Sequence, residues 1–324
     1  MNKTFCTIIS ANYRSYAETL FDSLVQFDNE AELNVLVVDA NIEQTRRGLN
    51  FLSAEEIRDQ IPIANKIYKK YHNPNNWDTL RWSFKPALML HLLQAGYDQV
   101  IFTDPDTHYY SDYQFLFDEL HKKSILLTPN WSGKDPKSDL RRFNYQFTDG
   151  IYNAGFIGAS RNGKEALHWW AEMCLFECKK IPQLRYFDDQ HYLNLMPVYF
   201  DDVSILKHRG CNVAGWNLVE CPRTSVDSEV VIAGKWPIVF VHFSEITFNA
   251  IANNKDDLLK PYSDLYERKL KQYGIDLDTE KYKFPTSSFL SKMKSLLKKS
   301  LRGEAFVYWD KKKFRPRFIY RTKR

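Results

Sequence analysis

Short apolar runs alternate with helically spaced apolar positions along the first part of the chain. Residues 4–10 (TFCTIIS), 33–38 (LNVLVV), 99–102 (QVIF) and 124–128 (SILLT) predict buried strands, and residues 15–27 and 84–94 predict helices between them. Strands that alternate with helices are typical of a parallel sheet covered on both faces. The pattern therefore predicts an α/β, Rossmann-like fold with a mostly parallel central sheet.

The second half of the chain is less regular. Residues 152–159 (YNAGFIGA) predict a strand that carries two glycines, and residues 166–178 predict a helix. Asp188-Asp189-Gln190 are expected to open a further helix through residues 191–195, and a late strand at 238–241 ends at His242. The chain shows no internal repeat and no low-complexity linker.

Polar residues follow several of the predicted strands at their carboxyl ends. Ala11-Asn12-Tyr13 follow the first strand, Asp39 follows the second, and Asp104-Pro105-Asp106 follow the third. Ligands of open α/β sheets bind in the crevice outside the carboxyl ends of the strands. We therefore expect these three loops to converge on one crevice.

Composition is ordinary for a globular protein of this length. The 324 residues are 44% hydrophobic and 26% charged, which suits one large domain or two smaller ones. The aromatic share of 15% favours either an aromatic-rich core or a groove in which rings stack on bases or sugars. The five cysteines form no CxxC pair, which predicts free buried thiols and no zinc site.

Positive charge is concentrated at the end of the chain. Residues 289–324 contain 13 Lys and Arg against Glu304 and Asp310, a net charge of 13 − 2 = +11, so the remainder carries 5 − 11 = −6. Apolar residues at helical spacing from Phe289 to Leu301 predict a basic amphipathic helix that lies on an anionic membrane, or else one that packs on the body. We expect no nucleic-acid partner.

Targeting signals are not evident in the sequence. Met1-Asn2-Lys3 lead directly into a strand pattern, and no apolar run approaches the length of about 18 residues that crosses a bilayer. The expected location is the cytoplasm, with the basic tail attaching the protein peripherally to the inner face of the cell membrane.

Asp104-Pro105-Asp106 offer the clearest chemistry. Two carboxylates one residue apart, after a buried strand, can share one hard cation such as Mg²⁺ or Mn²⁺, which keeps open positions for diphosphate oxygens. The alternative is an ordinary turn, where Asp and Pro are favoured. His242, at the end of another buried strand, could complete the metal site, or could be a hydrogen-bonded core histidine.

Three further groups are candidates for substrate contact. Asp188, Asp189 and Gln190 either cap a helix or meet the sugar and the attacking hydroxyl as acceptors, nucleophile or base. Asn153 and Gly155 allow close approach of a sugar, or mark a strand bend. Arg81 and Lys85 suit a phosphate, or are solvated at the surface.

Taken in order, these motifs resemble a known family of enzymes. The chain is similar to nucleotide-diphospho-sugar glycosyltransferases of the GT-A fold, of the family-eight type and its bacterial surface-polysaccharide relatives. The motifs are TIISANY at 7–13, VVDA at 37–40, RWSFKP at 81–86, VIFTDPDTHYYSD at 100–112, YNAGFIGAS at 152–160, DDQHYLN at 188–194, CNVAGWNL at 211–218 and VHFSE at 241–245. The resemblance covers roughly residues 4–270.

The resemblance implies a role for each matching position. Ala11, Asn12, Tyr13 and Asp39 would contact the nucleoside, with Arg81, Lys85, Asn153 and Gly155 also on the donor. Asp104, Asp106 and His242 would bind Mn²⁺ or Mg²⁺. Asp188, Asp189 and Gln190 would lie at the reacting centre, and Asn212, Trp216 and Asn217 on the acceptor side.

The implied function is metal-dependent transfer of a hexose from a nucleotide-diphosphate sugar, a UDP-sugar above all, to a glycan or lipid-linked acceptor, with retention of configuration. The implied domains are a glycosyltransferase domain at 1–270, with a nucleotide-binding half at about 1–130 and an acceptor half at about 131–270, and an extension at 271–324.

The family's phosphate-binding motif HFxGxxKPW is altered in this chain, because Glu245 replaces its glycine and Lys260 comes much later. The alternatives are a sugar nucleotidyltransferase, which would normally carry a glycine-rich loop in place of SANYRSY, and a non-catalytic nucleotide- or sugar-binding module.

Overall fold

The computed structural model describes residues 1–44, 46–181, 186–283, 305–310 and 315–320. Residues Met1–Thr279 form one compact unit and Glu280–Arg324 a second. Among the described residues, none of the helices combines the length and the apolar composition that a membrane span requires. The predicted division into halves at about residue 130 stays a prediction.

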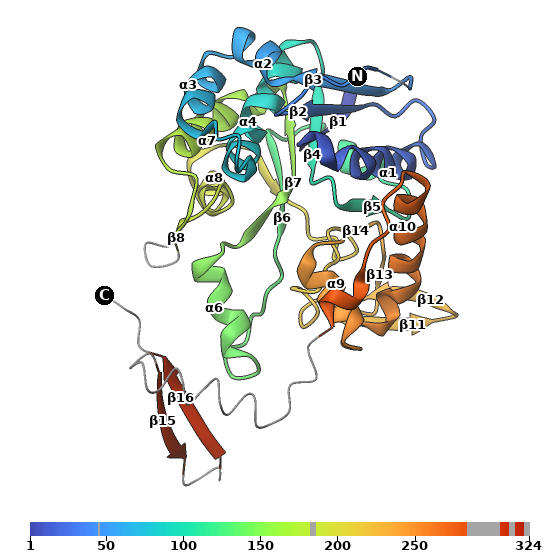
Figure 1. Cartoon of the computed structure of the whole chain (residues 1–324), viewed down its shortest axis with the longest axis vertical. Coiled ribbons are helices and arrows are strands. Elements are labelled where there is room, and N and C mark those ends of the chain that lie inside the picture. Colours follow the sequence, from blue (N-terminus) through green and yellow to red (C-terminus); the bar gives the residue numbers. More distant parts are fainter. Residues whose placement is uncertain (45, 182–185, 284–304, 311–314, 321–324) are drawn as a thin grey trace. The chain divides into compact units, whose positions relative to one another are not determined.

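A seven-stranded sheet forms the centre of the first unit, in the order β10-β6-β7-β4-β1-β2-β3 (Figure 1). Its strands are β1 (Lys3–Ile9), β2 (Leu33–Val37), β3 (Leu49–Ser53), β4 (Gln99–Thr103), β6 (Ile125–Pro129), β7 (Tyr152–Ser160) and β10 (Val203–Ile205). Only β7 runs antiparallel to its neighbours within this sheet. The predicted α/β class with a Rossmann-like, mostly parallel central sheet is confirmed.

Helices cover both faces of this sheet, and each face has its own apolar core (Figure 1). One core packs under α2 (Ala54–Gln60), α3 (Pro62–Tyr71), α4 (Asp78–Gln94) and α7 (Lys164–Phe176). The other packs under α1 (Arg14–Val25) and α5 (Gln114–Leu120). Strands β1, β2 and β4 are buried on both faces, which explains why they read as continuous apolar runs.

The remaining elements complete the first unit. They are η1 (Ala11–Tyr13), β5 (Thr107–Tyr109), α6 (Leu140–Thr148), η2 (Arg161–Gly163), β8 (Lys180–Ile181), β9 (Tyr186–Phe187), η4 (His191–Leu195), α8 (Met196–Tyr199), β11 (Arg223–Val226), β12 (Glu229–Ile232), β13 (Trp236–Pro237), β14 (Phe240–His242), α9 (Glu245–Ala252), η5 (Asp257–Leu259) and α10 (Lys260–Gln272). The next element, η6 (Thr279–Tyr282), begins at the last residue of the first unit, and the second unit contains an antiparallel pair, β15 (Ala305–Asp310) and β16 (Arg315–Tyr320).

Two sequence-based expectations about helices differ from the structure. The helix expected at residues 84–94 begins earlier, at Asp78, so Pro86 lies inside α4 rather than in its first turn. Most of α4 is buried, and this burial outweighs the local cost of a proline within a helix. The helix expected to open at Asp188 begins only at His191, because Asp188 adopts a left-handed conformation with φ +43°.

The C-terminal extension was expected to be helical. The amphipathic pattern from Phe289 to Leu301 lies outside the described residues. Further along, at β15 and β16, the chain forms a β-hairpin, so the extension is not helical throughout.

The five cysteines behave as the sequence predicted. All of them, Cys6, Cys174, Cys178, Cys211 and Cys221, are buried and free of disulfides. Burial raises the pKa of the Cys6 and Cys211 thiols well above the ordinary value, which keeps them protonated and unreactive.

Candidate active site

Two short strands bring His242 to the aspartate pair. Asp104 and Asp106 lie in the turn between β4 and β5, and β5 pairs antiparallel with β14 so that His242 stands opposite Thr107. Backbone bonds hold the turn on both sides, from Asp104 N to Gly155 O (2.8 Å) and from Phe243 N to Asp106 O (2.7 Å). The register of these two strands therefore places an imidazole from residue 242 beside carboxylates from residues 104 and 106.

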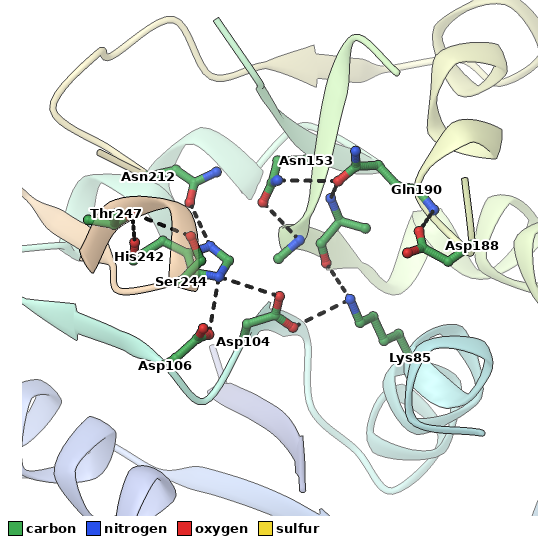
Figure 2. A network of polar contacts seen from close by, with 12 residues as sticks. Lys85, Asp104, Asp106, Asn153, Asp188, Gln190, Asn212, His242, Ser244 and Thr247 are labelled. Carbon is green, nitrogen blue, oxygen red and sulfur yellow. Dashed lines mark hydrogen bonds and ion pairs between the residues drawn. The ribbon is translucent and has the colours of Figure 1, made fainter. Parts of the chain in front are cut away.

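Ligand atoms of Asp104, Asp106 and His242 all lie within 4.8 Å of one another (Figure 2). The imidazole Nε2 of His242 is 3.1 Å from Asp106 Oδ1 and 3.8 Å from Asp104 Oδ2. The aspartates are partly exposed, whereas His242 is buried. The three side chains that the sequence singled out as metal ligands are thus gathered at one point.

The chemistry of this cluster fits a divalent metal ion. Two carboxylate oxygens and one imidazole nitrogen suit Mn²⁺ or Mg²⁺, with the partly exposed side left for further ligands.

Gly155 leaves room for the cluster. A Cβ at this position would come within 2.6 Å of His242 Cε1 and 2.7 Å of Asp104 Oδ2. The absence of a side chain at 155 is therefore a requirement of the site.

The electrostatics of the cluster favour a positive charge among the three groups. Burial by itself would lower the pKa of His242, but the carboxylates of Asp106 and Asp104 raise the pKa above its ordinary value. Burial would likewise raise the pKa of Asp106, but the charge of His242 and their hydrogen bond lower it. In this environment a metal ion would compete with the imidazole proton for the same carboxylates.

Lys85 connects the cluster to a second acidic group. Its side chain is only 5% exposed, so the alternative of a solvated surface lysine is wrong. Nζ lies 3.4 Å from Asp104 Oδ1 and 3.3 Å from Asp189 Oδ2, and it donates to Ala154 O at 3.0 Å. Burial would lower the pKa of Lys85, but Asp104 and Asp189 raise it, so the amine stays charged.

The three residues Asp188, Asp189 and Gln190 point to different partners. Asp188 pairs with Lys180 at 3.1 Å, and Asp189 is buried against Lys85. The amide of Gln190 is fixed to the neighbouring strand β7 and the loop before it. Its oxygen accepts from Asn153 Nδ2 (3.2 Å) and Ala154 N (3.1 Å) (Figure 2). Its nitrogen donates to Asp149 O (2.7 Å). Gln190 and Asn153 therefore form one hydrogen-bonded polar unit beside the cluster of Asp104, Asp106 and His242.

A cavity of about 180 Å³ opens on the aspartate side of the cluster. The predicted donor-site residues that line it are Tyr13, Arg81, Lys85 and Asp104. The lining also includes Asp106, which was predicted as a metal ligand, and Ile8, Trp82, Phe102 and Pro105. Ala11, Asn12 and Asp39 do not line this cavity, but Ala11 N donates to Asp39 Oδ1 at 2.8 Å, which joins the ends of β1 and β2. The loops expected to converge at the carboxyl ends of the strands are thus brought close together.

A larger cavity of about 610 Å³ lies on the His242 side. The predicted residues that line it are Asn153, Gln190, Trp216 and His242. The wall that α6 contributes was not predicted from the sequence, although two adjacent arginines followed by aromatic residues at 143, 145 and 147 were a readable signal. Cavities therefore open on both sides of the cluster of Asp104, Asp106 and His242.

Asn212 and Asn217 lie behind the larger cavity. Asn212 is 1% exposed, and its Oδ1 lies 3.3 Å from His242 Nδ1. Asn217 is fully buried, accepts from Ala214 N (3.1 Å) and donates to Asn212 O (2.8 Å). Both residues hold the loop that carries Trp216, whose ring meets the His242 ring edge-on at 5.1 Å.

Comparison with known proteins identifies relatives without an assigned activity. No protein-family model matches the chain. It is 29% identical over 257 residues to the uncharacterized protein YfnF of Bacillus subtilis (strain 168), covering 75% of this chain and 82% of YfnF. YfnD, an uncharacterized protein of the same strain, is 26% identical over 254 residues, covering 75% and 78%. The crystal structure of mouse xyloside xylosyltransferase 1 is similar with a TM-score of 0.48 and 12% identity, covering 76% of this chain and 98% of that one.

Proposed function

We propose that this chain is a glycosyltransferase that moves a hexose from a nucleotide-diphosphate donor, with Mn²⁺ or Mg²⁺ bound by Asp104, Asp106 and His242. The observation that carries the proposal is the meeting of these three ligand atoms within 4.8 Å, with a cavity on each side. A two-substrate transfer needs two adjoining sites and a means of stabilising the diphosphate that leaves. The sequence motifs of the GT-A type support the same reading.

Each cavity has residues that suit its proposed substrate. When bound, the metal ion would offset the negative charge that develops on the departing nucleotide diphosphate. Arg81 and the charged Lys85 line the smaller cavity and would bind the diphosphate oxygens. Asn153 and Gln190 line the larger one and would orient sugar hydroxyls by hydrogen bonds. We propose a UDP-sugar as donor and retention as the outcome, both on the sequence resemblance.

The alternative of a sugar nucleotidyltransferase has less support. Such enzymes cradle phosphates with a glycine-rich loop after the first strand, whereas here η1 follows β1 and the segment SANYRSY contains no glycine. The product distinguishes the two reactions, because a nucleotidyltransferase would release pyrophosphate. A non-catalytic binding module would bind nucleotide sugars without turnover.

The test is an assay of nucleoside diphosphate release from a panel of nucleotide sugars, with Mn²⁺ and with EDTA. Asp106→Asn removes one ligand charge, so we expect metal-dependent turnover to fall by about 100-fold or more. Asp118→Asn, an exposed acid on α5, is the matched control and should leave turnover unchanged. Equal turnover of Asp106→Asn and the parent, or release of pyrophosphate, would contradict the proposal.

A further part of the proposal concerns the extension. Its net charge of +11 over residues 289–324 is the reason to propose attachment to an anionic membrane, where a lipid-linked acceptor would be found. A chain that ends at residue 288 should no longer sediment with phosphatidylserine vesicles, while donor hydrolysis is unchanged. Vesicle binding that survives the truncation would refute this part alone.

A further inference from the structure

Helix α6 bounds the larger cavity. Arg142 and Gln146 bind the body of the protein, through the carbonyls of Trp216 and Gly133, and Arg142 also lines the cavity. Arg141, Tyr145 and Asp149 follow one another at intervals of four residues and line the cavity. Leu140 and Phe147 face outward and are 60% and 50% exposed. The helix is thus fixed by polar contacts so that one side forms a cavity wall.

The two adjacent arginines of α6 have different surroundings. The guanidinium of Arg142 is engaged with the carbonyls of Trp216 and Gly215 and lies 3.5 Å from Asp139. Arg141 donates from Nε to Tyr145 Oη at 2.6 Å, and its guanidinium lies 5.6 Å from the centre of that ring. Within the described part of the chain no ion pair is recorded for Arg141. Its two terminal amino groups form the edge of the guanidinium that binds an oxoanion in bidentate geometry, and they are available to a ligand.

The carboxylates nearby are held by other groups. Asp139 caps α6 by accepting from Arg142 N at 3.0 Å, and it pairs with the Arg142 side chain. Asp149 Oδ1 accepts from Thr148 Oγ1 at 2.7 Å. Neither Arg141 nor Asp149 has an ion-pair partner among the described residues, and of the two arginines of this wall Arg141 is the one without a carboxylate beside it.

The rest of the lining suits a saccharide. Tyr145, Phe187 and Trp216 provide ring surfaces for the apolar faces of sugar rings, and Asn130, Ser132, Asn153 and Gln190 provide hydrogen-bonding groups. Trp216 Nε1 is buried and has no hydrogen-bond partner among the described residues. A volume of about 610 Å³ lies in the range of ligand-binding sites.

We propose that the acceptor is an acidic saccharide, and that Arg141 binds its carboxylate or phosphate group while the aromatic residues of the cavity contact the sugar rings. This inference rests on the proposed function, because it names the acceptor of that reaction. A uronic acid presents a planar carboxylate and a sugar phosphate a tetrahedral phosphate group, and a guanidinium can bind two oxygens of either. Arg141 is then a specificity-determining residue at the acceptor site.

The experiment uses the full chain, loaded with UDP and Mn²⁺, on an array of matched oligosaccharides that are neutral, carry a uronic acid, or carry a phosphate. We expect binding to at least one acidic series to exceed binding to the neutral counterparts by tenfold or more. Arg141→Gln should reduce this preference to near parity. Lys137→Gln removes the same charge from an exposed position before α6 that does not line the cavity, and should keep the preference. The two acidic series distinguish a carboxylate from a phosphate.

Donor hydrolysis without acceptor, measured on the same variants, separates this inference from the proposed function. Unchanged hydrolysis with lost acidic preference in Arg141→Gln supports both. Acid-selective binding through Arg141 without any donor cleavage would support the site and overturn the transferase. Equal binding of neutral and acidic glycans by the parent, or a preference that survives Arg141→Gln, would overturn the inference while the transferase stands.

Discussion

The imidazole of His242 is oriented by a residue behind it. Asn212 Oδ1 lies 3.3 Å from Nδ1, on the side of the ring away from the aspartates (Figure 2). If Nδ1–H donates to this oxygen, the Nε2 lone pair is left facing Asp104 and Asp106, where a metal would bind. Asn212 itself has φ +57°, a left-handed conformation that asparagine tolerates better than most residues. Asn212 is thus a positioning residue for the cluster.

Asn212→Gly should weaken Mn²⁺ binding by 10- to 100-fold, because it removes the acceptor for Nδ1–H without straining the backbone. Asn212→Asp keeps an oxygen in the same place and should keep most of the affinity. Titration calorimetry with Mn²⁺ measures both. If Asn212→Gly binds the ion as tightly as the parent, Asn212 does not position the ring.

At the scale of elements, β7 does most to shape the site. It is the antiparallel strand within a sheet of otherwise parallel neighbours, and it runs between β4 and β6. Successive residues of a strand point to opposite faces, so Asn153 and Gly155 share one face. On that face Gly155 leaves space for His242 and Asp104, and its amide donates to Asn153 Oδ1 at 3.0 Å.

Gly155→Ala should abolish tight Mn²⁺ binding, since its Cβ would come within 2.8 Å of the Asn153 amide oxygen as well as of two ligand side chains. Gly158→Ala on the same strand is the matched control. Its Cβ would meet Leu120 Cδ1 at 2.7 Å in the core, so it should lower the free energy of unfolding without changing Mn²⁺ affinity. Calorimetric affinities and urea unfolding curves of the two variants decide the matter. Similar Mn²⁺ affinities for both would mean that the site does not need the space at 155.

At the scale of the whole first unit, a buried ion pair fastens the segment that carries Asn212 and Trp216. Arg223 Nη2 lies 3.0 Å from Asp256 Oδ2, and the two side chains are 2% and 1% exposed. Arg223 also donates to Ala214 O (2.8 Å) and Asn217 Oδ1 (3.2 Å). The pair therefore links the start of β11 to the chain before η5 and to the loop behind His242.

Arg223→Met should lower the free energy of unfolding by about 3–5 kcal/mol, because it leaves the Asp256 carboxylate buried without its partner. Lys260→Met breaks an exposed pair with Asp264 and should cost about 1 kcal/mol or less. Urea denaturation at neutral pH measures both changes. If Arg223→Met lowers the free energy of unfolding no more than Lys260→Met does, the buried pair contributes little to stability.

The class of fold and the chemistry at one strand end could be predicted from local sequence patterns. Continuous apolar runs at β1, β2 and β4 and helical spacing between them are local patterns, and Asp104-Pro105-Asp106 needed only the strand before them to be recognised as a candidate metal site. The rest of the candidate site depends on contacts between distant segments of the chain. The pairing of β5 with β14 brings His242 to the aspartates. Because α4 is buried, Lys85 lies between Asp104 and Asp189 and pairs with both. The contacts of Arg142 hold α6 in place as a wall of the larger cavity. Periodicity indicates which side of an element is buried, but it does not indicate which other element packs against that side. The site depends on the packing of distant elements, so it could not be predicted in full from the sequence.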